Sequence, residues 1–165
     1  MDLVEEALRA ELPKLAVDFF VVFSRFECAL KRSGIYAIGD ENGVSPDWDK
    51  FARDLGPRFL SDVLALDIAP VLVANPPKKQ VKLDDGMLGW KDTNAVARTS
   101  DLFVAIRRVR NNLVHGAKYQ DGGAGHPDFV EGSERSDVLL RQSMAVMSFA
   151  LKVRPDIHGY FRRYG

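Results

Sequence analysis

The sequence predicts an all-α fold, a helical bundle of four to five main helices with short extra segments. Apolar residues recur at three- and four-residue steps over 12–33 and again over 99–115, which places them on one face of an α-helix. A third long apolar segment spans 136–153 and stops before Pro155. Such helices bury their apolar stripes against one another, so a bundle is expected.

The composition is that of one globular domain covering 1–165. The chain has 165 residues, of which 46% are hydrophobic and 28% charged, and this balance excludes a largely disordered protein. Lys+Arg and Asp+Glu both number 23, which excludes a chain-wide polycation but allows a local basic patch. The sequence contains no apolar run of the roughly 20 residues that span a bilayer and no basic leader before an apolar core, so a cytoplasmic protein is expected.

The first helix is expected over 12–33, with Lys31 and Arg32 at its C-terminal end and Gly34 closing it. Its four phenylalanines predict a thick core between helices. Its apolar stripe consists of Leu15, Phe19, Val22, Phe23, Phe26 and Leu30.

Shorter elements are expected in the middle of the chain. Ser45 is a candidate N-cap and Pro46 a candidate first residue of a second helix, which runs to about Leu55. The Gly-Pro pair at 56–57 breaks this helix, and a third helical stretch follows over 58–66.

Beyond the third stretch, Pro70 interrupts the helical pattern. Residues 80–91 are the one place where apolar and polar residues alternate as in a strand, and Asp85-Gly86 suits a hairpin turn there.

The second half of the chain begins with a clear helix over 99–115, capped by Thr99-Ser100-Asp101 and closed by Gly116. Glycine and turn-forming residues over 120–135 predict a loop. Ser136-Asp137 then caps the last long helix, and a short helical turn is expected after it.

The segment most informative about function is RRVRNNLVHGAK, which carries four cations and no carboxylate in a chain of zero net charge. Asn111 and His115 are four residues apart and share a helix face. Arg110 and His115 lie about 140° apart on an ideal helix, although a long arginine side chain still reaches a common cleft. The four cations are Arg107, Arg108, Arg110 and Lys118.

These residue types suit the cleavage of RNA without a metal. Histidine transfers protons near neutral pH, and arginine stabilises the extra negative charge of a pentacoordinate phosphate. Asparagine orients the imidazole or holds a phosphate oxygen. The alternative is purely structural, because basic residues at a helix C-terminus also stabilise the helix dipole.

The segment Arg110-Asn-Asn-Leu-Val-His115 resembles the R-x4-6-H motif of the HEPN superfamily (higher eukaryotes and prokaryotes nucleotide-binding domains), including the polar residue after the arginine. Residues 19–34 resemble the first long helix of small prokaryotic HEPN proteins in conflict systems. The resemblance implies a helical bundle, frequent dimerisation and often metal-independent endoribonuclease activity, whereas some members are binding modules. HEPN toxins paired with a minimal nucleotidyltransferase antitoxin carry a tyrosine where this chain has Ala117, so tyrosine modification there is not expected.

Residues and resemblance together predict a metal-independent endoribonuclease of a toxin or phage-defence system that cleaves single-stranded RNA. The expected partners are RNA, a second copy of the chain and an antitoxin or regulator, with no cofactor, metal or membrane. In the dimer, the Phe-rich first helix, Val109 and Leu113 would supply apolar contact area. The alternatives are a non-catalytic HEPN module that binds nucleotide, RNA or a partner protein, and a plain helical dimerisation protein. The expected catalytic residues are Arg110, Asn111 and His115, and the expected substrate-binding residues are Arg107, Arg108, Asn112, Lys118 and Glu27.

Glu27 has two interpretations. It lies in the first helix beside Phe23 and Phe26, where it either faces the cleft and pairs with Arg110 or a neighbouring arginine, or pairs with Lys31 one turn later.

Five further residues are of types that can act as ligands or stacking partners. Trp48 and Trp90 either stack on a nucleic-acid base or pack in the core or on the surface of the protein. Cys28 is expected to be a small buried apolar residue. His126 and His158 lie too far apart in the sequence to indicate a metal site.

Overall fold

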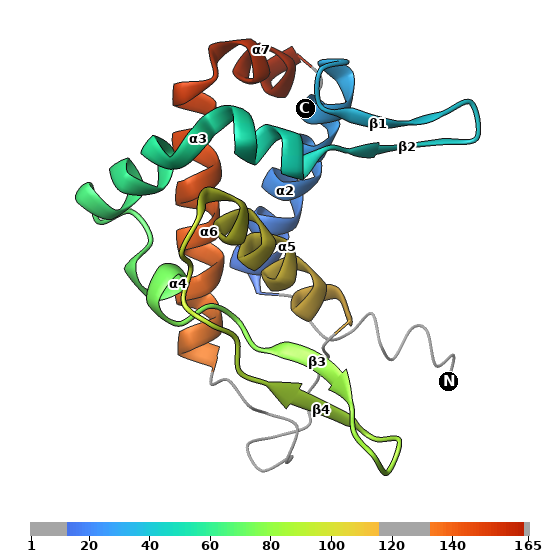
Figure 1. Ribbon diagram of the computed structural model, residues 1–165, viewed down its shortest axis with the longest axis vertical. Helices are drawn as coiled ribbons and strands as arrows, with labels where there is room; N and C mark the ends of the chain where they lie inside the picture. Colours follow the sequence, from blue (N-terminus) through green and yellow to red (C-terminus); the bar gives the residue numbers. More distant parts are fainter. Residues whose placement is uncertain (1–12, 116–132, 164–165) are drawn as a thin grey trace.

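The computed structural model describes residues 13–115 and 133–163, and six helices make up most of this part of the chain (Figure 1). The prediction of a mainly helical protein is confirmed, and the structure adds two small antiparallel hairpins. None of the helices in these two ranges is both long and apolar enough to cross a membrane. The helices are α2 (Lys14–Arg32), α3 (Trp48–Ala65), α4 (Pro70–Ala74), α5 (Thr99–His115), α6 (Ser133–Val153) and α7 (Pro155–Arg163).

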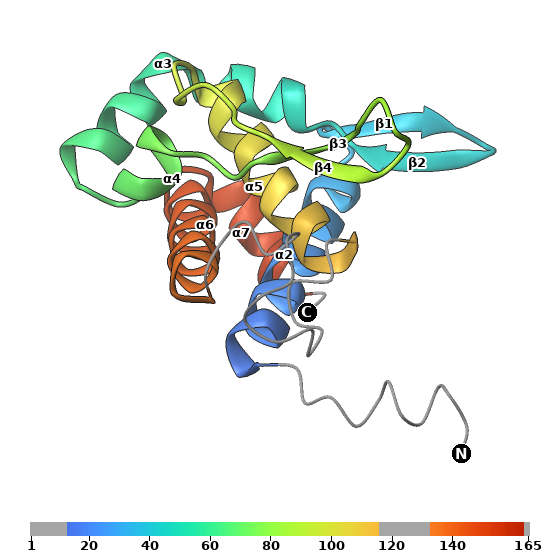
Figure 2. The ribbon, with the colours of Figure 1, turned by 90° about the horizontal axis from the view of Figure 1, so that it is seen from below.

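The hairpins are β1–β2 (Ala37–Asp40 and Gly43–Pro46) and β3–β4 (Lys79–Lys82 and Leu88–Lys91). The β3–β4 hairpin confirms the strand prediction for 80–91, whereas β1–β2 was not predicted. Both hairpins project from the helical body, which places their outer ends in solvent (Figures 1 and 2).

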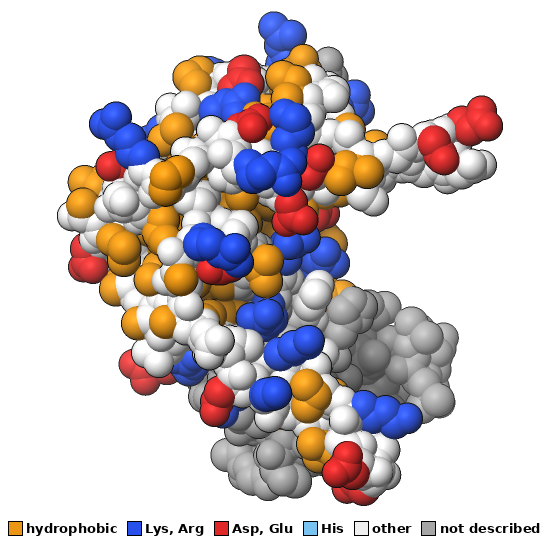
Figure 3. Space-filling view, in the orientation of Figure 1, with side chains coloured by type: hydrophobic (Ala, Val, Ile, Leu, Met, Phe, Trp, Pro, Cys, Tyr) orange, Lys and Arg blue, Asp and Glu red, His pale blue; other side chains and the backbone are white. Residues whose placement is uncertain are grey.

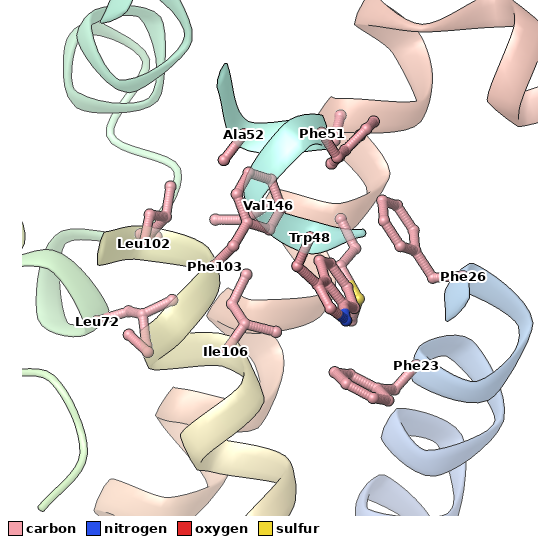
Figure 4. Packing of buried hydrophobic residues seen from close by; sticks show 14 of the residues in the cluster. Phe23, Phe26, Trp48, Phe51, Ala52, Leu72, Leu102, Phe103, Ile106 and Val146 are labelled. Carbon is pink, nitrogen blue, oxygen red and sulfur yellow. The ribbon is translucent and has the colours of Figure 1, made fainter. Parts of the chain in front are cut away.

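The core is formed by buried residues of α2, α3, α5 and α6, with smaller contributions from α4 and α7, and the indole of Trp48 lies among them (Figure 4). The indole stacks on Phe26 with 5.4 Å between ring centroids and an interplanar angle of 7°. It also stacks on Phe23 at 5.6 Å and touches Phe103 of α5 at 5.7 Å. The phenylalanines predicted to face inward at 19, 23 and 26 are all buried, as the helical periodicity required.

The start of α3 differs from the prediction. Asp47, not Ser45, is the N-cap, and its Oδ1 accepts a hydrogen bond from the backbone nitrogen of Lys50 at 2.9 Å. Ser45 and Pro46 belong to β2, where Pro46 pairs with Ala37. These residues are extended because they pair with β1, which lies earlier in the chain. A capping motif in the local sequence carries no information about that pairing.

The break predicted at Gly56-Pro57 is a kink inside α3. Gly56 has φ 71° and ψ −179°, which interrupts the helical hydrogen bonding. The hydroxyl of Thr99 donates to the Gly56 carbonyl at 2.7 Å. The first residue of α5 is thereby tied to the kink of α3.

Three other boundaries are corrected. Pro70 begins α4 at its first turn, where proline is favoured, instead of only interrupting the chain. Helix α6 begins at Ser133, so residues 133–135 are helical and Ser136 lies inside the helix rather than capping it. Helix α7 is nine residues long, more than a single turn. The remainder of the predicted loop, together with Gly116, lies outside the described residues.

We expect Gly56→Ala to lower the free energy of unfolding by about 1–3 kcal/mol, because its φ and ψ fall in a region that is essentially reserved for glycine. Urea denaturation followed by circular dichroism measures the change.

Gly159→Ala is the matched control. Gly159 lies in α7 without a positive φ, and an added Cβ would meet nothing within 4 Å. Alanine there should raise the free energy of unfolding by about 0.5–1 kcal/mol. If both substitutions change the free energy of unfolding equally, the backbone conformation of Gly56 does not require glycine.

Candidate functional site

Helix α5 presents one face to the core and the opposite face to solvent. Leu102, Ala105, Ile106 and Val109 are buried, because they recur at helical spacing on the inner side. Arg107, Arg108 and Asn111 occupy the outer side of the same helix and remain half-buried or exposed. Arg107 and Arg108 of the cationic run therefore lie on the outer side of the C-terminal half of α5.

Arg110 lies at the edge of α5 that faces α2. Its guanidinium carbon is 5.2 Å from the centroid of the Phe23 ring, a cation–π contact. Its Nε is buried without a hydrogen-bond partner, and no carboxylate in the described part of the chain pairs with it. Arg110 is thus a positioned cation whose charge no acid in the described part of the chain neutralises.

Asn111 faces outward and its side chain has no hydrogen-bond partner among residues 13–115 and 133–163. Helix α5 ends at His115, one turn after Asn111; the imidazole itself is outside what the structure describes. Within one chain, Arg110 therefore packs on α2 while Asn111 points to solvent. This divergence follows from the 100° step between consecutive helix residues.

Two further arginines border these residues. The Nη2 of Arg107 is 3.7 Å from Oδ1 of Asp49 in α3, a loose and largely exposed ion pair that contributes little stability. Arg108 is half-buried, and this burial lowers the pKa of its guanidinium, although an arginine stays protonated at neutral pH. No ion-pair partner of Arg108 lies in the described ranges.

The structure gives Asn112 a different role from the substrate contact predicted for it. Its side chain is only 2% exposed, and Nδ2 donates to the carbonyl of Lys78 at 2.9 Å. Asn112 therefore ties α5 to the segment that leads into the β3–β4 hairpin.

Glu27 is also engaged elsewhere. Its Oε1 accepts a hydrogen bond from Nε1 of Trp48 at 3.0 Å. Neither interpretation of Glu27 from the sequence is met, because its described partner is the indole and neither Arg110 nor Lys31. The carboxylate completes the burial of Trp48 by satisfying its only polar group.

The remaining tryptophan, cysteine and histidine residues differ in their exposure. Trp48 is a packing residue at 3% exposure, so it cannot stack a base. Trp90 is half-buried in β4, Cys28 is half-buried rather than fully enclosed, and His158 is exposed on α7. Lys118 and His126 lie outside the described residues. In the described ranges, no three His, Cys, Asp or Glu side chains are grouped so as to hold a metal ion.

Sequence reasoning missed a second polar cluster, around Tyr36. The buried hydroxyl of Tyr36 donates to Oδ2 of Asp54 at 2.9 Å and accepts from the guanidinium of Arg154. Arg154 in turn holds Asp156 through two hydrogen bonds of 2.9 and 2.6 Å. Burial raises the pKa of Tyr36, so it stays protonated at neutral pH. Its partners are 18 and 118 residues away, and no local signal links them.

We expect Glu27→Ala to lower the free energy of unfolding by about 1–3 kcal/mol, because it leaves the buried indole N–H of Trp48 without an acceptor. Glu27→Gln keeps a side-chain oxygen at the same place and should retain most of the stability. Urea unfolding followed by tryptophan fluorescence measures both.

Lys31→Ala serves as the control, since Lys31 does not pair with Glu27 and its loss should be nearly neutral. If Glu27→Ala unfolds no more easily than Glu27→Gln, the hydrogen bond does not contribute to stability.

Comparison with protein-family models, with curated proteins and with solved structures finds no match to this chain. The resemblance of residues 110–115 to the HEPN motif therefore stays a prediction. Function has to be argued from the residues displayed on and around α5.

Proposed function

We propose that the protein is a metal-independent endoribonuclease of the HEPN type that cleaves single-stranded RNA in a toxin or phage-defence system. The observation that carries this proposal is Arg110, a guanidinium positioned on Phe23 with no neutralising carboxylate in the described residues. It directly precedes Asn111 and lies five residues before His115, in the order that the motif requires.

In this reaction the ribose 2′-OH attacks the adjacent phosphorus, and the bond from phosphorus to the 5′-oxygen breaks. His115 accepts the proton of the 2′-OH as a base or donates one to the departing 5′-oxygen as an acid. Arg110 stabilises the additional negative charge of the pentacoordinate phosphorus, and Asn111 orients the imidazole or a phosphate oxygen. The products carry a 2′,3′-cyclic phosphate and a 5′-hydroxyl.

A second copy of the chain fits this chemistry. Arg110 packs on α2 while Asn111 faces outward, so the two side chains of one copy are poorly placed to contact the same phosphate from two sides. Two α5 ends related by a twofold axis would place two such sets around one cleft. A twofold contact is also the commonest association of small soluble proteins.

The apolar area for this dimer comes from different residues than the sequence indicated. Phe19, Phe23, Phe26 and Val109 are buried in the core of their own chain. Leu113 is partly buried against the same core. On α2 and α5, the exposed large apolar residues are Val17, Phe20, Val21 and Val114. Phe20 precedes Phe23 by one turn and Val114 follows Arg110 by one turn, so the two exposed residues adjoin the Arg110–Phe23 contact along their helices.

We expect the purified protein to cut single-stranded RNA in EDTA and to leave single-stranded DNA of the same sequence intact, because the nucleophile is the substrate's own 2′-OH.

His115→Ala should reduce the cleavage rate by about 10²–10⁴-fold. Arg110→Lys should also reduce it, because an ammonium does not replace a two-pronged guanidinium on phosphate. Gel analysis of end-labelled oligonucleotides measures these rates.

Arg58→Lys is the control, an exposed arginine on α3 that lies near Asp62 at 3.7 Å. It is two residues from Gly56, which contacts the first residue of α5 and therefore the end opposite His115. It should retain full activity. Cleavage that vanishes in EDTA and returns with Mg²⁺ would overturn the metal-free mechanism. Binding of RNA without cleavage would favour the non-catalytic module.

We expect a homodimer of twice 18.4 kDa by light scattering. Phe20→Asp should shift it toward the monomer, because Phe20 is 53% exposed on the proposed contact face. Mixing His115→Ala chains with Arg110→Ala chains should restore part of the activity if the two copies share a site.

Leu64→Asp is the matched control, since Leu64 is 54% exposed but lies on α3. It should leave the dimer intact. A monomer that cleaves RNA at the full rate would refute the shared site.

A further inference from the structure

Two hydrogen bonds tie the base of the β3–β4 hairpin near the end of α5. The Lys78 carbonyl accepts from Nδ2 of Asn112 at 2.9 Å, three residues before the end of α5 at His115. The hydroxyl of Thr93 donates to the carbonyl of Pro77 at 3.2 Å, which joins the two ends of the hairpin segment. The hairpin therefore leaves the protein body at the end of α5 that carries the proposed catalytic residues (Figure 1).

One face of this hairpin carries two lysines directly opposite each other. Lys79 of β3 and Lys91 of β4 are register partners, so their side chains stand on the same face as neighbours. Both are exposed, and neither has an ion-pair partner among the described residues. Like charges directly opposite destabilise a β-ladder, so folding alone gives no reason for this pair.

The lysine pair is continuous with the cations of α5. Arg108 precedes Asn112 by one turn, so it lies on the flank of α5 that holds the hairpin. Figure 3 shows several Lys and Arg side chains over α5 and β3–β4, with acidic side chains at the hairpin tip and a few among the cations. Among the latter are Asp92, which pairs with Lys78, and Asp49, which pairs loosely with Arg107. In a chain with no net charge, the cations that remain form a locally positive surface.

We propose that the face of β3–β4 formed by Lys79 and Lys91 binds the phosphate backbone of single-stranded nucleic acid and leads the strand to the end of α5. The inference rests on the proposed function, since it names the path of the RNA to that site. Lysines act as point charges on phosphates and read no bases, so the face holds RNA and DNA strands alike. Only the reaction at α5 requires the 2′-hydroxyl.

Binding of fluorescent single-stranded DNA of about 12 nucleotides, followed by anisotropy over a range of salt concentrations, tests the proposal without cleavage. Each phosphate contact contributes about 0.7 to the slope of log affinity against log salt for single strands. The double variant Lys79→Gln, Lys91→Gln should therefore reduce the slope by about 1.4. Between about 50 and about 200 mM salt, the wild type should lose about sevenfold more affinity than this variant.

The matched control is Lys82→Gln, Lys152→Gln, which removes the same charge from the opposite face of the hairpin and from α6. It should leave the slope unchanged. The double arginine variant Lys79→Arg, Lys91→Arg should retain the wild-type slope. Because glutamine relieves the repulsion between the two lysines, the test variant should not lower the midpoint of thermal unfolding.

The proposal is overturned if the salt slope falls equally in the Lys79, Lys91 glutamine variant and in the Lys82, Lys152 glutamine variant, or if it falls in neither. Equally tight binding of poly-glutamate through the same lysines would overturn it too and would assign the face to an acidic protein. A protein that binds DNA through the pair but cleaves no RNA keeps this inference and loses the proposed function. A protein that cleaves RNA with an unchanged KM in the Lys79, Lys91 double variant keeps the proposed function and loses this inference.

Discussion

The rest of the structure depends on the burial of one large side chain, the indole of Trp48. It stacks on Phe26 and Phe23 of α2 and contacts Phe103 of α5, so it joins three helices from separate parts of the sequence. Aromatic pairs at such distances stabilise a core beyond the area they bury. The indole N–H would oppose this burial without an acceptor, and Glu27 supplies one.

This core also sets the position of the site. The ring of Phe23 contacts both the indole of Trp48 and the guanidinium of Arg110. The same aromatic side chain therefore packs α2 against α3 and positions the cation of α5. Helix α5 is further tied at both ends, by Thr99 to the Gly56 carbonyl and by Asn112 to the Lys78 carbonyl. A cation that is already held in place stabilises the charge of a transition state effectively, because the protein then needs little reorganisation during the reaction.

A chain of zero net charge can still carry a locally positive surface, which the proposed contact with RNA requires. The carboxylates described in the structure pair locally in several places, as Asp18 does with Lys14 and Asp101 with Arg98. Arg107 is paired only loosely, with Asp49 at 3.7 Å, whereas Arg108, Arg110, Lys79 and Lys91 have no ion-pair partner among the described residues. Net charge therefore says little about binding, whereas the distribution of charge over the folded surface decides it.

The sequence by itself determined what depends on local spacing. Helical periodicity located α2 and α5, the Gly-Pro pair located the kink in α3, and strand alternation located β3–β4. The cations of α5, the Arg110–Asn111 pair and His115 were also visible in the sequence, because residues 107–115 span only about two and a half helical turns.

Only the tertiary structure decided what depends on partners far along the chain. Ser45 looked like a helix cap until β1 paired with β2, and Glu27 looked free for an arginine until Trp48, 21 residues later, folded against it. Asn112 became a tie to Lys78, and Lys79 met Lys91, because a hairpin register joins residues that no helical or local rule connects. A polar side chain has several possible partners of similar free energy, and the choice among them is made by which segments the hydrophobic core brings within about 3 Å.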